Sequence, residues 1–450
     1  MADSARRSAV PTRPSAGPRW RKWLRRGGRT ALAATTLAFA AGSHGQPDAP
    51  LPLLLLPPVA LGADDIAVVV NDADPASVEV GRAYAAARRI AAERVIHVSF
   101  PADRPALTEA QFRAVQAQLE ATVPSTVQAY ALAWTQPYRV ECMSITSAFA
   151  FGFHIDHCAA GCQLTRPSPY FDANTTKPFR DLGLRPAMLL AAPGVAEAKA
   201  MIARGVRSDG RWPDGKAYLL STSDGQRNVR ATSFDHVQRL LARAYPIERL
   251  TSDSLAERSD VMFYFTGLTR VPDLASNRFL DGAIADHVTS SGGVLIDSPQ
   301  MSVLDWIQAG ATGSYGTAQE PCNFRQKFPD IAVVMGRYLA GETLIEAYWK
   351  SVQMPGQGVF VGEPLARPFG GVRSRASGDA VEFQTRSLRP GRYLLQAAEA
   401  TFGPFRTIGA TTVVDLGVHT IRLPRLPWRT YRLVPVAASA AAVPSTVPVR

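Results

Sequence analysis

The sequence has few cysteines and no long apolar segment. Of its 450 residues, four are cysteine and six are lysine. A membrane-spanning helix takes about 20 consecutive apolar residues, and the apolar stretch Thr30–Ala41 has only 12. No later segment is apolar enough either, so we expect no membrane span in the rest of the chain. What the sequence does have is 46% hydrophobic residues, which suffices for a substantial buried core.

Basic side chains outnumber acidic ones, but the excess is concentrated at the N-terminus. The net charge of +11 includes nine arginine and lysine residues within the first 30 positions. Residues 1–63 hold those nine of the 49 basic side chains and two of the 38 acidic ones, and without them the net charge is +4. Such a balance, with no basic stripe, is typical of an ordinary solvated surface. We therefore expect no nucleic-acid partner.

Residues 1–45 have the pattern of a signal peptide. A basic region is followed by the apolar stretch Thr30–Ala41 and by an Ala-Phe-Ala sequence that ends at Ala40, an order that is typical of secretory signals. Arg25-Arg26 leaves open whether export follows the Sec or the twin-arginine route. A disordered cytoplasmic tail is the alternative. The signal predicts a periplasmic or extracellular protein.

The rest of the chain divides by composition into four parts. Residues 46–63 are rich in proline and leucine and are expected to form a linker or the end of a longer leader, because Pro52, Pro57 and Pro58 prevent a regular helix in the apolar run Leu51–Ala63. Strand and helix patterns alternate over residues 64–369, which predicts an α/β domain with a mostly parallel sheet and helices on both faces. Alternating stretches between Pro and Gly turns predict a small antiparallel β module at 374–436. Residues 437–450 are expected to be disordered.

The α/β pattern predicts individual elements along residues 64–369. The expected strands are Ile66–Val70, Val95–Ser99, Thr126–Trp134, Ala187–Ala191, Lys216–Ser221, Val261–Phe265 and Gly293–Asp297. The expected helices are 76–90, 109–121, 195–204, 234–244, 281–290, 302–309, 331–339 and 344–352. Residues 142–185 interrupt the alternation and contain three of the four cysteines. We expect them to form a long excursion of the kind that carries binding or lid roles.

The cysteines are expected to form disulfides, because an even number in an oxidising compartment favours pairing. Cys158 and Cys162 are the favoured pair, although the sequence cannot choose among the three possible pairings. The same region holds the densest cluster of potential zinc ligands, which are His154, His157, Cys158 and Cys162. Their spacing matches no structural zinc pattern, so no metal and no cofactor are expected.

Three residues near the expected carboxyl edge of the sheet are candidates for catalysis. Cys322 can act as a nucleophile with His287 as its base and Glu320 beside them. The rivals are a disulfide from Cys322 to Cys142 and a purely structural His287. Ligands of parallel sheets bind beyond the carboxyl ends of the strands, and the candidates for ligand binding at that edge are Gln300, Ser314 and Tyr315.

A glycine-rich stretch, Gly310-Ala-Thr-Gly-Ser-Tyr-Gly316, is predicted to form a turn. Its amides can hold an anion, but it lacks the Lys-[Ser/Thr] of a phosphate loop and the spacing of a dinucleotide fingerprint. Close backbone packing at a strand end is the favoured interpretation.

The stretch from Val261 to Phe369 resembles an uncharacterised, exported bacterial family. The segments that carry the resemblance include Tyr264–Gly267, Ala285–His287, Glu320–Phe324 and Gly362–Phe369, and Val68–Asn71 looks similar as well. The resemblance covers most of residues 64–369 and implies no particular activity.

A weaker resemblance is to gingipain-like and caspase-like cysteine peptidases. In those peptidases His-Gly follows one strand, a catalytic Cys follows the next, and a Gly-Asp-Pro-like motif closes the domain. The corresponding positions here are Thr266-Gly267, Ser298-Pro299-Gln300 and Gly362-Glu-Pro364. The resemblance therefore implies the layout of these peptidases without their Cys-His dyad.

Three functional hypotheses remain open on the sequence. The first is a peptidase-like protein without the dyad that binds an unknown ligand or protein partner at the carboxyl edge of its sheet. The second is a hydrolase of unknown substrate that uses Cys322 and His287. The third is a cell-surface interaction protein that acts through the C-terminal β module.

Overall fold

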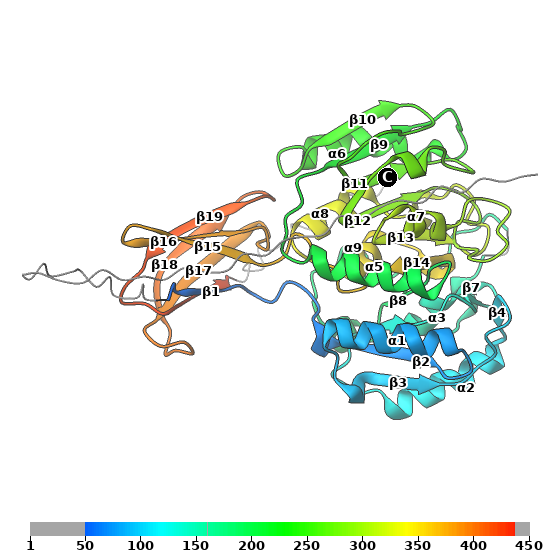
Figure 1. Ribbon diagram of the computed structural model, residues 1–450, viewed down its shortest axis with the longest axis horizontal. Helices are drawn as coiled ribbons and strands as arrows, with labels where there is room; N and C mark the ends of the chain where they lie inside the picture. The colour runs from blue at the N-terminus through cyan, green and yellow to red at the C-terminus, as the bar shows by residue number, and fades with distance from the viewer. Residues whose placement is uncertain (1–49, 160, 437–450) are drawn as a thin grey trace, which may run out of the picture. The chain divides into compact units, whose positions relative to one another are not determined.

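The structure is a computed structural model that describes residues 50–159 and 161–436 (Figure 1). It has a large, mostly parallel sheet, helices, and smaller, mostly antiparallel sheets. The expected signal peptide at 1–45 and the expected disordered tail at 437–450 lie outside the described residues. Among the residues that are described, no helix is long and apolar enough to cross a membrane.

Ten strands form the central sheet, in the order β10-β9-β11-β12-β13-β14-β8-β5-β2-β3. Neighbouring strands are parallel except for β13 and β14, which are antiparallel. The carboxyl ends of β9, β11, β12 and β13 therefore meet at one edge. The strands are β2 Ile66–Asn71, β3 Val95–Val98, β5 Ala129–Leu132, β8 Ala187–Leu189, β9 Lys216–Ser221, β10 Ile247–Thr251, β11 Val261–Thr266, β12 Phe279–His287, β13 Gly313–Thr317 and β14 Gly358–Gly362.

The helices cover the sheet in two groups. Helix α5 contacts both α1 and α7 (Figure 1), and α8 contacts both α6 and α9. Polar N-caps fix where several helices begin; Asp74, for example, accepts the N–H of Ala76 at the start of α1. The helices are α1 Pro75–Arg88, α2 Glu109–Thr122, α3 Ile145–Phe151, α4 Pro178–Leu182, α5 Val195–Ser208, α6 Phe234–Leu241, α7 Val303–Ala309, α8 Ile331–Leu339 and α9 Leu344–Ser351.

The sequence-based prediction is wrong around β12. Residues 281–290, expected as a helix, are mostly strand, and the expected strand Gly293–Asp297 is loop. Asp286 and His287 are polar residues of a kind that a fully buried strand rarely holds. Both are buried in β12 because tertiary partners satisfy them. The expected glycine-rich turn is also largely strand, β13.

A small β module follows the α/β part. Its two sheets, β1-β20-β17-β18 and β15-β16-β19, enclose a core that includes Val381, Phe383 and Tyr431. Strand β1 lies within the expected linker and pairs with β20. Its strands are β1 Leu53–Leu55, β15 Val372–Ser377, β16 Ala380–Thr385, β17 Gly391–Ala398, β18 Arg406–Val413, β19 His419–Pro424 and β20 Thr430–Pro435. A third small sheet combines β4 Ala106–Leu107, β6 Arg139–Val140 and β7 Met143–Ser144.

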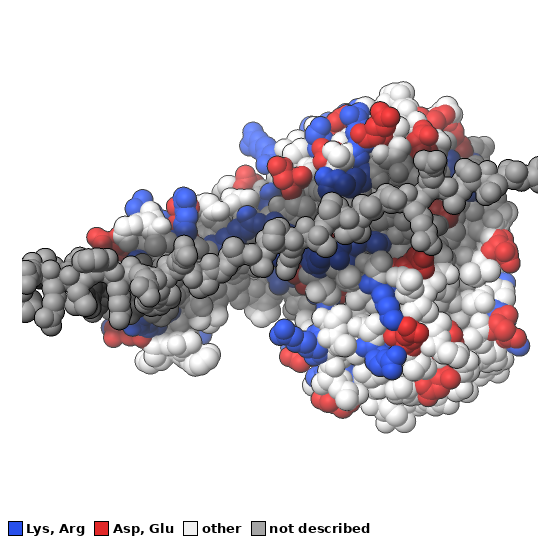
Figure 2. Space-filling model, in the orientation of Figure 1, with Lys and Arg blue, Asp and Glu red and all other residues white. Residues whose placement is uncertain are grey.

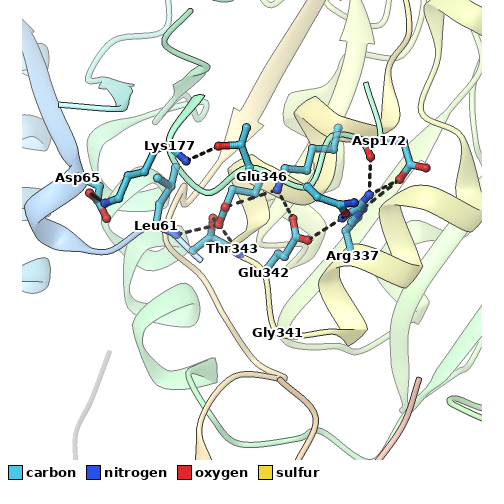
Figure 3. Close-up of polar contacts among 12 residues, drawn as sticks. Leu61, Asp65, Asp172, Lys177, Arg337, Gly341, Glu342, Thr343 and Glu346 are labelled. Atoms are coloured by element: carbon cyan, nitrogen blue, oxygen red, sulfur yellow. Dashed lines mark hydrogen bonds and ion pairs between the residues drawn. The ribbon is translucent and has the colours of Figure 1, made fainter. Parts of the chain in front are cut away.

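A buried network of charges stabilises the region of α8 and α9 (Figure 3). Lys350 Nζ lies 2.7 Å from Glu342 Oε2 and 3.7 Å from Glu346 Oε1, and these three side chains are completely buried. Glu342 also pairs with Arg337 and with Arg389 of the β module. Each buried charge thus has a partner of opposite sign, which a buried charge requires.

The same network reaches the N-terminal segment and the excursion. Glu346 Oε2 accepts hydrogen bonds from the backbone N–H of Leu61, at 2.9 Å, and from Thr343 Oγ1, at 2.7 Å. Arg337 donates to Asp172, which lies in the 142–185 excursion. Segments that are far apart in the sequence are therefore tied to one buried cluster.

Candidate functional site

The candidate site begins where β9 and β11 end. Thr222, directly after β9, donates a hydrogen bond of 2.7 Å from Oγ1 to the carbonyl oxygen of Gly267, directly after β11. A Cβ atom on Gly267 would lie 2.0 Å from the carbonyl oxygen of Arg227. Only glycine fits so close an approach, which packs the end of β11 against the connection from β9 to α6.

A cavity of about 280 Å³ lies at this edge. Its wall comes from the connections after β9, β12 and β13 together with one residue of the excursion. The polar or disulfide-bonded lining residues are Gln226, Arg227, Thr289, Ser290, Glu320, Asn323, Cys162 and Cys322. Parallel sheets bind ligands beyond the carboxyl ends of their strands, so this cavity is the candidate ligand site.

Arg227 is the cationic group of the cavity. Its Nη1 lies 2.8 Å from Asp224 Oδ2, and its Nε donates to Thr289 Oγ1 at 3.3 Å. These contacts fix the guanidinium while a quarter of the side chain stays exposed. A guanidinium has five N–H donors, and Nη2 donates to no partner among the described residues. Arg227 therefore has donor capacity left for a ligand.

Cys322 does not carry a free thiol. It forms a disulfide with Cys162, and Cys142 pairs with Cys158. Both expected pairings, Cys158 with Cys162 and Cys142 with Cys322, are therefore wrong, and the described part of the chain has no free cysteine. The expectation for Cys158 and Cys162 relied on their closeness in sequence. The fold instead pairs each of them with a more distant cysteine, at separations of 16 and 160 residues. The thiolate nucleophile is contradicted by this pairing.

His287 is a buried, neutral imidazole. Its Nδ1 accepts a hydrogen bond of 2.9 Å from Trp306 Nε1. Burial, with Arg230 nearby, lowers the pKa of His287 to about 3. The acceptor nitrogen of the ring thus faces Trp306, and His287 does not line the cavity. The structure therefore does not bring His287 to Cys322 as a base. Its neighbour Asp286 has a different partner, Arg230, at 2.6 Å.

Of the three catalytic candidates, Glu320 and the disulfide-bonded Cys322 line the cavity, and His287 does not. The side chain of Glu320 is exposed at the rim, and its Oε1 accepts the backbone N–H of Cys322 at 2.7 Å. A second oxygen remains for a ligand, so Glu320 supplies an anionic group on the cavity wall.

Gln300 supports the wall of the cavity. Its Oε1 accepts from Thr289 Oγ1 at 2.5 Å and from the N–H of Ser291 at 2.9 Å. These bonds hold the loop that follows β12 in place. Gln300 is therefore placed behind the lining residue Thr289, and it is not itself a lining residue.

Ser314 and Tyr315 lie inside β13, away from the cavity lining. Both are buried, and Tyr315 donates from its hydroxyl to the carbonyl oxygen of Lys327 at 2.5 Å. The glycines around them serve close packing, because a Cβ on Gly316 would lie 2.4 Å from the backbone of Gly292. The favoured packing interpretation of this stretch agrees with that contact.

The histidines of the excursion have structural contacts. His154 Nδ1 accepts the N–H of Asp156 at 3.2 Å, and the buried ring of His157 stacks on Phe151 with centroids 4.7 Å apart. Burial lowers the pKa of His157 to about 4. Cys158 and Cys162 belong to different disulfides. Within the described ranges, no group of three or more His, Cys, Asp or Glu side chains is placed to hold a metal ion.

A second, smaller cavity of about 200 Å³ shares Phe328 with the first one. Arg230 lines it and donates from Nη2 to the carbonyl oxygen of Thr266 at 2.9 Å. Lys327, next to Phe328, is completely buried, and its amine has no hydrogen-bond partner in the described chain. Burial lowers the pKa of Lys327 to about 8, which nearby Glu320 opposes.

Sequence reasoning missed Arg227, Thr289 and Lys327. Arg227 and Thr289 follow strands that end at the same edge. The polar run directly after the buried strand β9 is a signal from which Arg227 could have been found. The signal for Thr289 was hidden because β12 was predicted as a helix. Nothing in the local sequence marks Lys327 as buried, since lysine is almost always exposed.

Comparison with known proteins adds little. No protein-family model and no curated protein matches the chain. One solved structure, described as "Structure of Protease", is similar with 9% sequence identity and a TM-score of 0.39, over 84% of this chain and 98% of that chain. A likeness at this level carries no argument about fold or activity.

Proposed function

We propose that the chain is an exported α/β protein, related in fold to caspase-like and gingipain-like peptidases, that binds a small ligand at the carboxyl edge of β9–β13 and has no Cys-His dyad. The observation that carries the proposal is the 280 Å³ cavity at this edge, with Arg227 anchored in its wall. Since β12 is the strand that follows β11 in the sheet, the residues after it are Val288-Thr289. In the comparison with those peptidases, Val288-Thr289 therefore take the position of the catalytic Cys, in place of the expected Ser298-Pro299-Gln300. Neither Val288 nor Thr289 has a thiol.

The chemistry of the cavity favours a ligand with both an anionic and a cationic group. Arg227 presents free guanidinium donors, and Glu320 presents a free carboxylate oxygen. Arginine binds carboxylates with paired hydrogen bonds, and a carboxylate accepts from an ammonium. An amino acid or a dipeptide carries both groups close together and therefore matches this pair of residues.

The proposal also covers the location of the protein, its domain limits and the hydrolase alternative. Two disulfides are typical of an oxidising compartment, so we propose periplasmic or extracellular location. We keep 64–369 and 374–436 as the proposed limits of the α/β domain and the β module. The hydrolase that uses Cys322 and His287 is not proposed, because the first is in a disulfide and the second is a neutral acceptor.

Binding can be tested with a matched series of dipeptides. Ala-Ala carries both charges, acetyl-Ala-Ala only the carboxylate, and Ala-Ala-amide only the ammonium. We expect Ala-Ala to raise the melting temperature of the full chain most, and each capped peptide to raise it less. Arg227→Gln should abolish the preference for a free carboxylate, and Glu320→Gln the preference for a free ammonium.

Arg239→Gln on α6 is the matched control, because Arg239 is exposed and does not line the cavity. It should bind the three peptides as the unmodified chain does. Equal effects of all three peptides, or no effect on the melting temperature at millimolar concentration, would refute a zwitterion site.

A further inference from the structure

One end of the β module exposes large apolar side chains. Phe402, in the connection from β17 to β18, is 93% exposed, and Leu426, in the connection from β19 to β20, is 69% exposed. Leu53, the first residue of β1, is 52% exposed. Isolated exposed apolar residues are ordinary on protein surfaces, but a group of them marks an interaction site.

These residues belong to one surface, which we call the module tip and define as residues 399–406 and 425–432 with Leu53. The two connections are joined, because Arg429 donates its N–H to the carbonyl oxygen of Ala398 at 2.9 Å and Thr430 donates from Oγ1 to that of Thr401 at 3.0 Å. The N–H of Leu53 donates to the carbonyl oxygen of Arg429 at 3.0 Å. Figure 1 shows the orange β17–β18 connection extending beyond the strands.

The module tip is also cationic. It contains four arginines, Arg406, Arg425, Arg429 and Arg432, against one acidic residue, Glu399. Two of the guanidinium groups lie over aromatic rings: Arg406 is 5.1 Å from the ring centroid of Trp428, and Arg432 is 4.0 Å from that of Phe405. Such cation–π contacts keep the charges beside the apolar surface.

The β module as a whole is also more positively charged than the α/β part. Residues 372–436 hold ten arginines, no lysine and four acidic residues, a net charge of +6, whereas residues 64–371 have a net charge of −3. On the face drawn in Figure 2, acidic and basic side chains are interspersed over the α/β part. The positive excess beyond residue 63 is therefore a property of the β module.

We infer that the module tip docks on an anionic phospholipid bilayer. Lipid phosphates attract arginines near the surface, and exposed aromatic and leucine side chains enter the boundary between headgroups and acyl chains. A soluble polyanion satisfies the arginines but leaves Phe402, Leu426 and Leu53 in water. The inference is independent of the ligand cavity, since the two sites share no residue.

Sedimentation with vesicles tests the inference on the full chain. Vesicles of phosphatidylcholine with phosphatidylglycerol should bind it more tightly than vesicles of phosphatidylcholine alone, and added salt should weaken the binding. Each arginine near an anionic surface contributes about fivefold in affinity, so Arg406→Gln with Arg429→Gln should lower it about 25-fold. Phe402→Ser with Leu426→Ser should lower binding to both kinds of vesicle.

A matched control is Arg239→Gln with Leu240→Ser, which removes one exposed arginine and one exposed leucine from α6. It should bind vesicles as the unmodified chain does. All variants involve exposed side chains, and unchanged melting temperatures will verify that they fold. Equal binding by the tip variants and the control overturns the inference, as does capture of polyglutamate with no preference for anionic vesicles.

Discussion

The buried charge network offers a sharp test of the packing around α8 and α9. Glu342→Gln removes the carboxylate that Lys350, Arg337 and Arg389 share. Loss of one partner from a buried ion pair costs about 3–5 kcal/mol, because the other charge is left without compensation. For a domain of about 300 residues, an unfolding entropy of about 2.1 cal/mol/K per residue converts 4 kcal/mol into a decrease in melting temperature of about 6 °C.

The assay is thermal and urea unfolding, followed by circular dichroism. Glu109→Gln is the control, because Glu109 also forms an ion pair, with Arg113, but that pair is exposed. It should cost less than about 1 kcal/mol. Glu342→Gln combined with Lys350→Met removes one charge of each sign and should therefore cost about 0.5–3 kcal/mol less than the sum of the two single changes.

The reasoning fails if Glu342→Gln costs no more than Glu109→Gln. It also fails if the effects of Glu342→Gln and Lys350→Met are strictly additive, since additivity shows that the two side chains do not interact.

Three more expectations follow from particular residues. Burial lowers the pKa of His157 to about 4, from the ordinary value of about 6.5. The free energy of unfolding should therefore be at its full value above pH 6.5 and fall towards pH 4 by up to about 1.4 kcal/mol per pH unit. In urea unfolding, His157→Phe should flatten that pH dependence. Gly267→Ala should lower both stability and dipeptide affinity, because its Cβ displaces the backbone of Arg227; unchanged affinity in calorimetry would contradict this. Replacing Cys162 and Cys322 by Ser opens a loop of about 160 residues and should lower the free energy of unfolding by up to about 5 kcal/mol. Unfolding at the same urea concentration as the unmodified chain would contradict this expectation.

The sequence predicts the regular part of the fold well. The helices expected at 109–121 and 331–339 agree with α2 and α8 to within one residue. These segments have a polar N-cap and a clear apolar period, and both signals are local. The first strands of the sheet were found in the same way, because short apolar runs end there at polar turns.

The prediction failed where a distant partner decides the structure. Asp286 and His287 are tolerated in β12 only because Arg230 and Trp306 satisfy them. The disulfide of Cys322 depends on a partner 160 residues away. The position of the candidate site was predictable from the rule that parallel strands bind ligands at their carboxyl edge. Glu320 and Cys322 were among the predicted candidates and do line the cavity. Arg227 and Thr289 were missed, and Thr289 was hidden because β12 was predicted as a helix.

The cavity beside Arg227 is proposed to hold a dipeptide or an amino acid. The most direct measurement is hydrogen–deuterium exchange of the full chain with and without Ala-Ala. Bound ligand should protect the backbone of the three connections that line the cavity, at 222–230, 288–291 and 318–323, and Arg227→Gln should remove the protection. Protection confined to other segments, or none at saturating Ala-Ala, would contradict the account.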